Sequence, residues 1–498
     1  MKKMINGINS NLLTSQLTTD KILKLAYLTP DLLTPRPISK FPQQELTNKK
    51  EVIAEYFTSQ PSDYVDELDQ WIALNGLSHN PSLFVYVPCF NEDENIRNLY
   101  LQYRKQSLIN RKGDESIICM VVNSPIPGMS ARDENRFLNS IKELIIYANS
   151  CAWLHVVAKR FPRPVACLGR ARKYGLDYCL RVVQITQHPN AVIIANEGDT
   201  VWISDRYLEM HRQSLQDSSA VLSQGVVSYP EFAQRPPALN VFLETREAVH
   251  HGQGLALDKL PSFGGIMPVG RNFSVLAWAA AAVGGVDPTR RVGTDDDIVF
   301  GHQISRWFGA KAKQFLEINL VTNPRREARI VDSICAGIDN DSKKSYEKFH
   351  EDTSVYDEKY DDLKCRCANL LAVSLSDSLY VSLCRQYFQW VHRSVMVEIV
   401  KEEKCYVEML DQYNRHEVGY WDLENYIPSL YNSHVKKYSL ADRKQHIDVH
   451  LRYAFSLFQM FCRDISFVPD ILPEAWIPRD LINKEQELYY AVDQTSPL

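Results

Sequence analysis

Two carboxylates, Glu197 and Asp199, stand two positions apart directly after the apolar run Ala191–Ala195. Side chains two positions apart on an extended chain point to the same side, so both carboxylates can face one point. Carboxylate oxygens are the hard ligands that Mg²⁺ and Mn²⁺ prefer. A metal held there would neutralise a diphosphate and make it a good leaving group, which predicts transfer chemistry. The simpler alternative is an acidic turn before a helix.

Basic residues that could meet such a diphosphate are grouped in the segment Gly169–Gly175. Arg170, Arg172 and Lys173 all lie within it. Arginine binds phosphate oxygens through paired, charge-assisted hydrogen bonds, and lysine binds them as a point charge. We therefore expect this segment to contact phosphate groups, although a solvated helix face would have the same composition.

Residues that could hydrogen-bond a nucleotide follow two earlier apolar runs. Pro88, Asn91 and Glu92 come directly after the first run, and Asn123 comes after the second. The side chains of Asn91, Glu92 and Asn123 carry the oxygen and nitrogen atoms that hydrogen-bond a nucleotide base or ribose. Taken alone, Asn123 would more simply be a turn residue, because asparagine is common in turns.

These polar segments are separated by alternating apolar runs and amphipathic stretches. Four runs are expected to be strands, namely Leu83–Val87, Ile117–Val122, Leu154–Ala158 and Ala191–Ala195. Three stretches have helical spacing, namely Asp93–Gln106, Ala131–Tyr147 and Arg170–Val183. The alternation predicts an α/β fold with a mostly parallel, Rossmann-like sheet and helices on both faces. Ligands of such sheets bind beyond the carboxyl ends of the strands, where the polar segments lie.

The order and spacing of these motifs resemble the family-two glycosyltransferases, which have the GT-A fold. V-P-C-F-N-E-D-E-N-I is similar to their opening strand and loop, and G-R-A-R-K-Y-G to their Gly-x-Ala-Arg-Asn segment, with Lys173 at the Asn. A-N-E-G-D-T resembles the metal-binding Asp-x-Asp, with Glu197 at the first Asp. Farther on, G-R-N-F-S-V-L-A-W-A-A-A-A-V-G-G-V-D-P, G-T-D-D-D-I and N-P-R-R-E resemble the acceptor-side, base and diphosphate motifs.

The resemblance implies a metal-dependent hexosyltransferase that uses a nucleotide diphosphate-sugar, with UDP the favoured nucleotide. It places Asp296, or alternatively Asp295, as the general base of an inverting reaction. Apart from the resemblance, one Asp of this run is expected to cap the helix that follows, which is a frequent use of Asp. The resemblance also places Arg325 and Arg326 near the diphosphate, and Mn or Mg on Glu197 and Asp199. For His250 and His251 a surface or core role is the simpler expectation, and a third metal ligand is the alternative. The resemblance does not identify the acceptor, which could be a glycan, a protein or a small molecule.

Composition narrows the class of protein further. The chain of 498 residues has 45% hydrophobic and 23% charged residues, which is typical of globular proteins. A net charge of -5 argues against nucleic-acid binding driven by charge alone. The 11 cysteines lack zinc-type spacing, which favours reduced thiols and a cytoplasmic location. No apolar run approaches the length of a membrane span.

Three regions are expected along the chain. Residues 1–80 are expected to form an irregular and partly helical leader, with a helix break near Pro61. Residues 81–335 hold the GT-A motifs, and residues 336–498 predict a helical C-terminal domain, because Leu379–Val400 and Ile447–Cys462 have apolar residues at helical spacing. The last region is expected to shape acceptor choice.

Two other functions fit parts of the pattern. A catalytically inactive GT-A domain that serves as a binding scaffold would explain the departures at Lys173 and Glu197. A sugar nucleotidyltransferase has a related nucleotide-binding sheet, but its first loop is usually rich in glycine. The loop here, Cys89-Phe90-Asn91-Glu92, contains no glycine, which makes this the weaker alternative.

Overall fold

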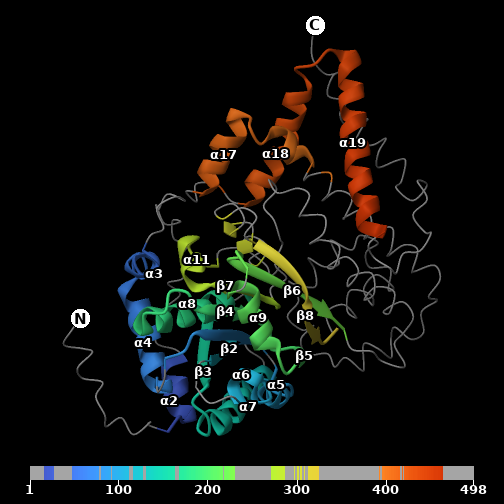
Figure 1. The fold of residues 1–498 in the computed structure, drawn as a ribbon. Helices are drawn as coiled ribbons and strands as arrows, with labels where there is room; N and C mark the ends of the chain where they lie inside the picture. The colour runs from blue at the N-terminus through green and yellow to red at the C-terminus, as the bar shows by residue number, and fades with distance from the viewer. Residues whose placement is uncertain are drawn as a thin grey trace. The chain divides into compact units, whose positions relative to one another are not determined.

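The structure is a computed structural model of the chain, shown in Figure 1. It describes residues 16–26, 48–77, 80–90, 92–110, 116–126, 131–162, 168–216, 218–229, 271–286, 297, 300–301, 303–304, 308, 312–324, 392, 395–414, 418 and 420–463. The chain divides into two compact units. The first comprises Met1–Ser223, Val269–Phe300 and Ile318–Val321, and the second Gln224–Pro268, Gly301–Glu317 and Thr322–Leu498.

Four parallel strands form the centre of the first unit, as the sequence predicts. They are β1 (Leu83–Cys89), β2 (Ser116–Ile126), β3 (Leu154–Pro162) and β4 (Val192–Ala195), in the spatial order β3-β2-β1-β4. Every residue of β1 and β4 is buried. Burial on both faces of a parallel sheet explains why these strands are continuous apolar runs rather than alternating patterns.

The sheet continues beyond β4 with strands that the alternation does not predict. Strand β7 (Phe273–Leu276) pairs with β4 in the antiparallel direction. The described strands together follow the order β3-β2-β1-β4-β7-β6-β8-β5, with β6 at Leu222–Ser228, β8 at Ala312–Thr322 and β5 at Thr200–Ile203. The antiparallel pairing brings the residues just before β7 to the carboxyl end of β4.

Helices cover both faces of the parallel strands (Figure 1). Helix α8 (Leu168–Thr186) packs on β1 and β2 from one face, and α7 (Ala131–Ala148), which contacts α5 (Ile96–Arg104), packs on β2 and β3 from the other. Gly175 lets α8 approach β1 closely, because a Cβ there would lie 2.9 Å from the Tyr86 Cβ. The same unit also contains three shorter helices, α6 (Ser107–Asn110), α9 (Tyr207–Gln216) and α11 (Ala277–Ala282).

The described helices of the expected leader belong to the same compact unit as the sheet. Helices α3 (Lys49–Thr58) and α4 (Ser62–Asn75), separated at Pro61 as predicted, both contact α8, and α2 (Thr19–Ala26) contacts β3. The buried faces of α3 and α4 therefore pack on α8, and α3 also contacts α11 while α4 also contacts β3. The expected domain boundaries near residues 80 and 335 stay predictions.

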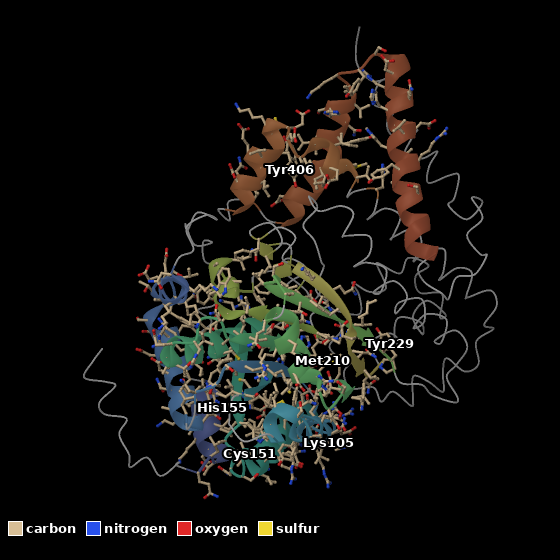
Figure 2. The ribbon with its side chains drawn as sticks, in the orientation of Figure 1. Lys105, Cys151, His155, Met210, Tyr229 and Tyr406 are labelled. Carbon is tan, nitrogen blue, oxygen red and sulfur yellow. The ribbon has the colours of Figure 1, made fainter. Side chains whose placement is uncertain are left out.

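Buried polar contacts join these N-terminal helices to the sheet layer. The Lys159 ammonium of β3 lies 2.8 Å from the Glu67 carboxylate of α4, and Tyr174 of α8 donates to the same carboxylate. Four residues before Lys159 in the same strand, His155 (labelled in Figure 2) shares a 2.6 Å hydrogen bond with the Tyr178 hydroxyl of α8. Burial raises the pKa of Tyr174 and Tyr178 well above the usual range, so both stay protonated.

The described part of the last third is helical. It contains α17 (Lys404–Asn414), α18 (Tyr420–Val435) and α19 (Leu440–Arg463), and α18 contacts both of the others. The predicted helix Ile447–Cys462 lies within α19, whereas most of Leu379–Val400 falls outside the described residues. None of the described helices has a stretch long and apolar enough to cross a membrane.

Candidate functional site

The loop after β4 is held rigidly by Asn196. The backbone amide of Asn196 donates to the Tyr86 carbonyl at 3.1 Å, and its side-chain amide donates to the Tyr103 hydroxyl at 2.6 Å. Its side-chain oxygen accepts from the Glu197 amide at 2.8 Å and from the Thr200 hydroxyl at 2.6 Å. A buried residue that satisfies donors on both sides of a turn fixes its shape, so Glu197 and Asp199 have defined positions.

Gly198, between the two carboxylates, brings this loop against the end of β1. Its amide donates to the Pro88 carbonyl at 3.0 Å, and its carbonyl accepts from the Asn95 side chain at 2.6 Å. A Cβ at this position would lie 2.8 Å from the Glu92 Cγ and 3.0 Å from the Pro88 oxygen. No larger residue fits without moving one of the loops. Pro88, Glu92, Glu197 and Asp199, predicted from separate motifs, are therefore neighbours.

Two arginines and three carboxylates form an alternating chain of charges at this edge. The Arg172 guanidinium contacts the Glu197 carboxylate through Nη2, and its Nη1 lies 3.6 Å from Asp297 Oδ2. The Arg271 guanidinium lies between the predicted metal ligands, with Nε 3.5 Å from Glu197 Oε2 and Nη1 3.5 Å from Asp199 Oδ2. We call these five residues, from Asp297 to Asp199, the charge chain.

The charge chain is largely removed from solvent. The exposed fractions of the Arg172, Glu197 and Arg271 side chains are 5%, 7% and 6%, and those of Asp297 and Asp199 are 12% and 18%. Charges at this depth are stable only with opposite partners, because desolvation of an unpaired ion costs several kcal/mol. Asp199, the most exposed of the five, marks the side of the chain that solvent reaches.

The sulfur at the end of β1 is not a nucleophile in this environment. Cys89 is fully buried, and its thiol pKa is raised above the usual range, first by burial and then by the Glu92 and Asp199 carboxylates. The thiol therefore stays protonated at neutral pH, and the thiolate is the reactive form.

Two further predicted residues lie at the same edge. Arg170 is 7% exposed and stands in the first turn of α8, whose N-terminal amides and dipole favour anions. Asn123 follows Val122, which pairs with Cys89 in the β1–β2 register. Its side-chain oxygen is buried and has no hydrogen-bond partner among the described residues. An acceptor atom buried in this way is the kind of group that a ligand satisfies.

Lys173 is a correction to the sequence analysis, because it does not face the phosphate region. Its ammonium lies 2.8 Å from Asp177 and 2.7 Å from the Tyr56 hydroxyl, and it is 2% exposed. Tyr56 and Tyr64 also donate to Asp177, at 2.6 Å and 2.8 Å. Lys173 points away from Arg172 because successive residues of a helix lie about 100° apart. Lys173 therefore ties α8 to α3, and its partner Asp177 ties α8 to α4.

Arg271 was missed by the sequence analysis as a site residue. It precedes β7, about seventy positions after the carboxylates it contacts, so no local spacing links them. Its neighbour Asn272 is fixed by Tyr207 and His211 of α9, which donate to its side-chain oxygen at 3.0 Å and 3.1 Å. The only sequence signal was the Gly-Arg-Asn start of the acceptor-side motif.

Several predicted residues lie outside the described part of the chain. They are Asn91, Asp295, Asp296, Arg325, Arg326, His250 and His251. Of the three consecutive aspartates only Asp297 is described, and it contacts Arg172. The general base and the second pair of arginines therefore stay predictions.

Glu197 and Asp199 supply carboxylate oxygens, the kind of ligand that a divalent cation prefers. Each also lies 3.5 Å from a nitrogen of the Arg271 guanidinium. Within the described ranges, however, no three His, Cys, Asp or Glu side chains are grouped as a metal site. The carboxylates that would bind the metal are already paired with arginines. Comparisons with known proteins add no assignment, because no family model and no curated protein matches the chain.

Proposed function

We propose that this protein is a GT-A glycosyltransferase that moves a hexose from a nucleotide diphosphate-sugar, with UDP favoured, to an acceptor. The observation that carries the proposal is the meeting of Glu92, Glu197 and Arg172 at one edge of a parallel sheet. They come from three separate segments of the sequence. Ligands of open α/β sheets bind at this edge.

The described residues supply most of what a nucleotide diphosphate requires. Asn123 has a buried acceptor atom for a base or ribose donor, and Arg170 and Arg172 stand in the first two turns of α8, where phosphate is favoured. Mn or Mg on Glu197 and Asp199 would neutralise the leaving diphosphate. Asp296, or alternatively Asp295, would take the proton of the acceptor hydroxyl, with Arg325 and Arg326 completing the phosphate contacts.

One observation favours a second candidate, an inactive domain that binds a partner or a ligand. The Arg271 guanidinium already neutralises both predicted metal ligands, and an arrangement that is satisfied without a metal has no need of one. Such a scaffold would still bind a nucleotide but would not turn over a nucleotide-sugar. Binding and turnover therefore separate the two candidates.

A thermal-shift screen of nucleotide-sugars, with and without Mn²⁺, tests the proposal at the level of binding. A ligand that binds only the folded state raises the melting temperature, by an amount that grows with the ratio of ligand to Kd. We expect UDP-sugars with Mn²⁺ to give the largest increase and uridine alone a small one. If no nucleoside diphosphate or nucleotide-sugar raises the melting temperature, both the transferase and the nucleotide-binding scaffold are wrong.

A further inference from the structure

Amide side chains from α5 and its two ends hydrogen-bond the backbone of β5 and of the residues around it. Asn98 of α5 donates to the Val201 carbonyl at 2.8 Å, and Gln106, just beyond the helix, donates to the Ser204 carbonyl at 2.8 Å. Strand β5 is the terminal strand in the order of the described sheet. The amides of α5 therefore satisfy carbonyl groups that a further strand would otherwise bind.

Asn95, at the start of the same helix, bonds the residues on both sides of Asp199. Its Nδ2 donates to the Gly198 carbonyl at 2.6 Å and to the Thr200 carbonyl at 2.9 Å. These two carbonyls belong to the residues directly before and after Asp199. One amide nitrogen thus uses both of its N–H groups on the backbone that flanks a candidate metal ligand.

The usual role of an asparagine before a helix does not explain this side chain. An asparagine at this position ordinarily caps the helix, but the Asn95 side chain makes no capping hydrogen bond. Its oxygen accepts from Asn98 at 3.2 Å, and its backbone amide donates to the Glu92 carbonyl at 2.9 Å. The nitrogen must face Gly198 and Thr200, because a carbonyl oxygen only accepts. Asn95 therefore joins the loop after β1 to the loop after β4.

We propose that Asn95 is a positioning residue of the candidate site, which sets the direction of the Asp199 carboxylate. Its consequence for a ligand rests on the proposed function: where Mn²⁺ joins Asp199 to a diphosphate, Asn95 sets the affinity for the metal. Replacement of a residue that orients a metal ligand typically costs about 10- to 100-fold in metal affinity or activity. The predicted base, Asp296, belongs to another segment, so turnover at saturating Mn²⁺ should change little.

Amide hydrogen exchange of the full chain without any ligand tests the positioning itself. Asn95→Leu keeps the approximate volume of the side chain and removes both donors. The amides of Gly198 and Thr200, which form hydrogen bonds of their own at 3.0 Å and 3.2 Å, should exchange roughly 2- to 10-fold faster, the usual net effect of one lost hydrogen bond. Asn98→Leu is the matched control, because it removes a bond to β5 beyond this loop, and it should leave both amides unchanged. Unchanged exchange in Asn95→Leu, or equal acceleration in both variants, overturns the proposal.

The release of uridine diphosphate from UDP-sugars, measured over a titration with Mn²⁺, tests the consequence. In Asn95→Leu the Mn²⁺ concentration for half-maximal release should rise about 10- to 100-fold, with the rate at saturation close to that of the wild type. Asn98→Leu should follow the wild type. A lower rate at every Mn²⁺ concentration with an unchanged midpoint would indicate a general structural defect and overturn the proposal.

A second variant covers the case in which Asn95→Leu does not fold. Asn95→Asp keeps the shape of the side chain but turns an acceptor toward two carbonyl oxygens, so it must show the faster exchange of Gly198 and Thr200, and normal exchange there overturns the proposal. Faster exchange in the Asn95 variants, together with no release from any UDP-sugar by the wild type, would uphold the positioning and reject the proposed function.

Discussion

The guanidinium of Arg172 contacts the carboxylate of Glu197, and this contact joins the second turn of α8 to the loop after β4. The two residues are 25 positions apart in the sequence and both are buried. Each was predicted to bind a different part of the same ligand, the arginine its phosphates and the glutamate its metal. Their direct contact means that neither role can be changed without affecting the other.

Replacement of Arg172 should separate phosphate recognition from nucleoside recognition. We expect Arg172→Ala to weaken binding of uridine diphosphate much more than binding of uridine, because only the first has phosphates. The variant also leaves Glu197 with one fewer partner, so the free energy of unfolding should fall by about 3–5 kcal/mol. Calorimetric titrations with both ligands, together with urea denaturation, measure the two effects. Equal losses for uridine and its diphosphate would place Arg172 away from the phosphates.

Lys173, next in the sequence, should behave differently. Lys173→Met leaves the fully buried Asp177 without its ammonium partner, so we expect a loss of about 3–5 kcal/mol in the free energy of unfolding. Nucleotide affinity of the folded fraction should not change. Combining it with Asp177→Asn removes the unpaired charge and should restore part of the stability. Weaker diphosphate binding with stability unchanged would return Lys173 to the phosphate site.

Three consecutive aspartates allow a comparison of the predicted base with its neighbours. Asp296→Asn should lower turnover by about two to four orders of magnitude, the usual effect of general base catalysis, with little change in donor affinity. Asp297→Asn weakens the contact with Arg172 and should reduce stability more than turnover. If Asp295→Asn has the large kinetic effect instead, the alternative assignment is correct. If neither has it, the base lies elsewhere.

His211, which supports Asn272 beside Arg271, predicts a dependence of stability on pH. Burial lowers the pKa of His211 from 6.5 to about 3, so the folded protein holds the ring neutral. Protons then bind the unfolded chain more readily, and the stabilisation, complete above pH 6.5, is lost as the pH falls toward 3. His211→Gln should reduce the slope of unfolding free energy against pH by up to about 1.4 kcal/mol per pH unit. Parallel curves for the two proteins between pH 6 and 4.5 would show that His211 does not titrate in this way.

The central strands could be predicted because burial on both faces leaves an unbroken apolar run, as in Leu83–Cys89. The polar residues after them were found for the same reason, since a parallel sheet brings its carboxyl ends together. The position of Lys173 was predicted wrongly. Its spacing of four residues from Asp177 is visible in the sequence, but the contacts of this pair with Tyr56 and Tyr64 of the N-terminal helices are not. Arg271 depends on an antiparallel strand from a distant segment, which no local pattern reveals.

The N-terminal helices show the same limit. Their helical spacing and the break at Pro61 were predicted, but the sequence indicated no connection with the sheet. Such a connection depends on side chains such as Tyr56 and Glu67 finding partners more than ninety positions away. In the sequence these residues look like ordinary polar positions of an amphipathic helix. Their specific partners are defined only in the folded structure.

The most direct measurement of the proposed function is the release of nucleoside diphosphate from nucleotide-sugars by the wild type and by Asp199→Asn, each with Mn²⁺. The substitution keeps the shape of the side chain and removes the charge that meets Arg271 and the metal. Slow release of uridine diphosphate from one UDP-sugar by the wild type, abolished in Asp199→Asn and in excess chelator, is the result that the account predicts. Undiminished release by Asp199→Asn, or no release from any nucleotide-sugar by a wild type that binds it, would contradict the account.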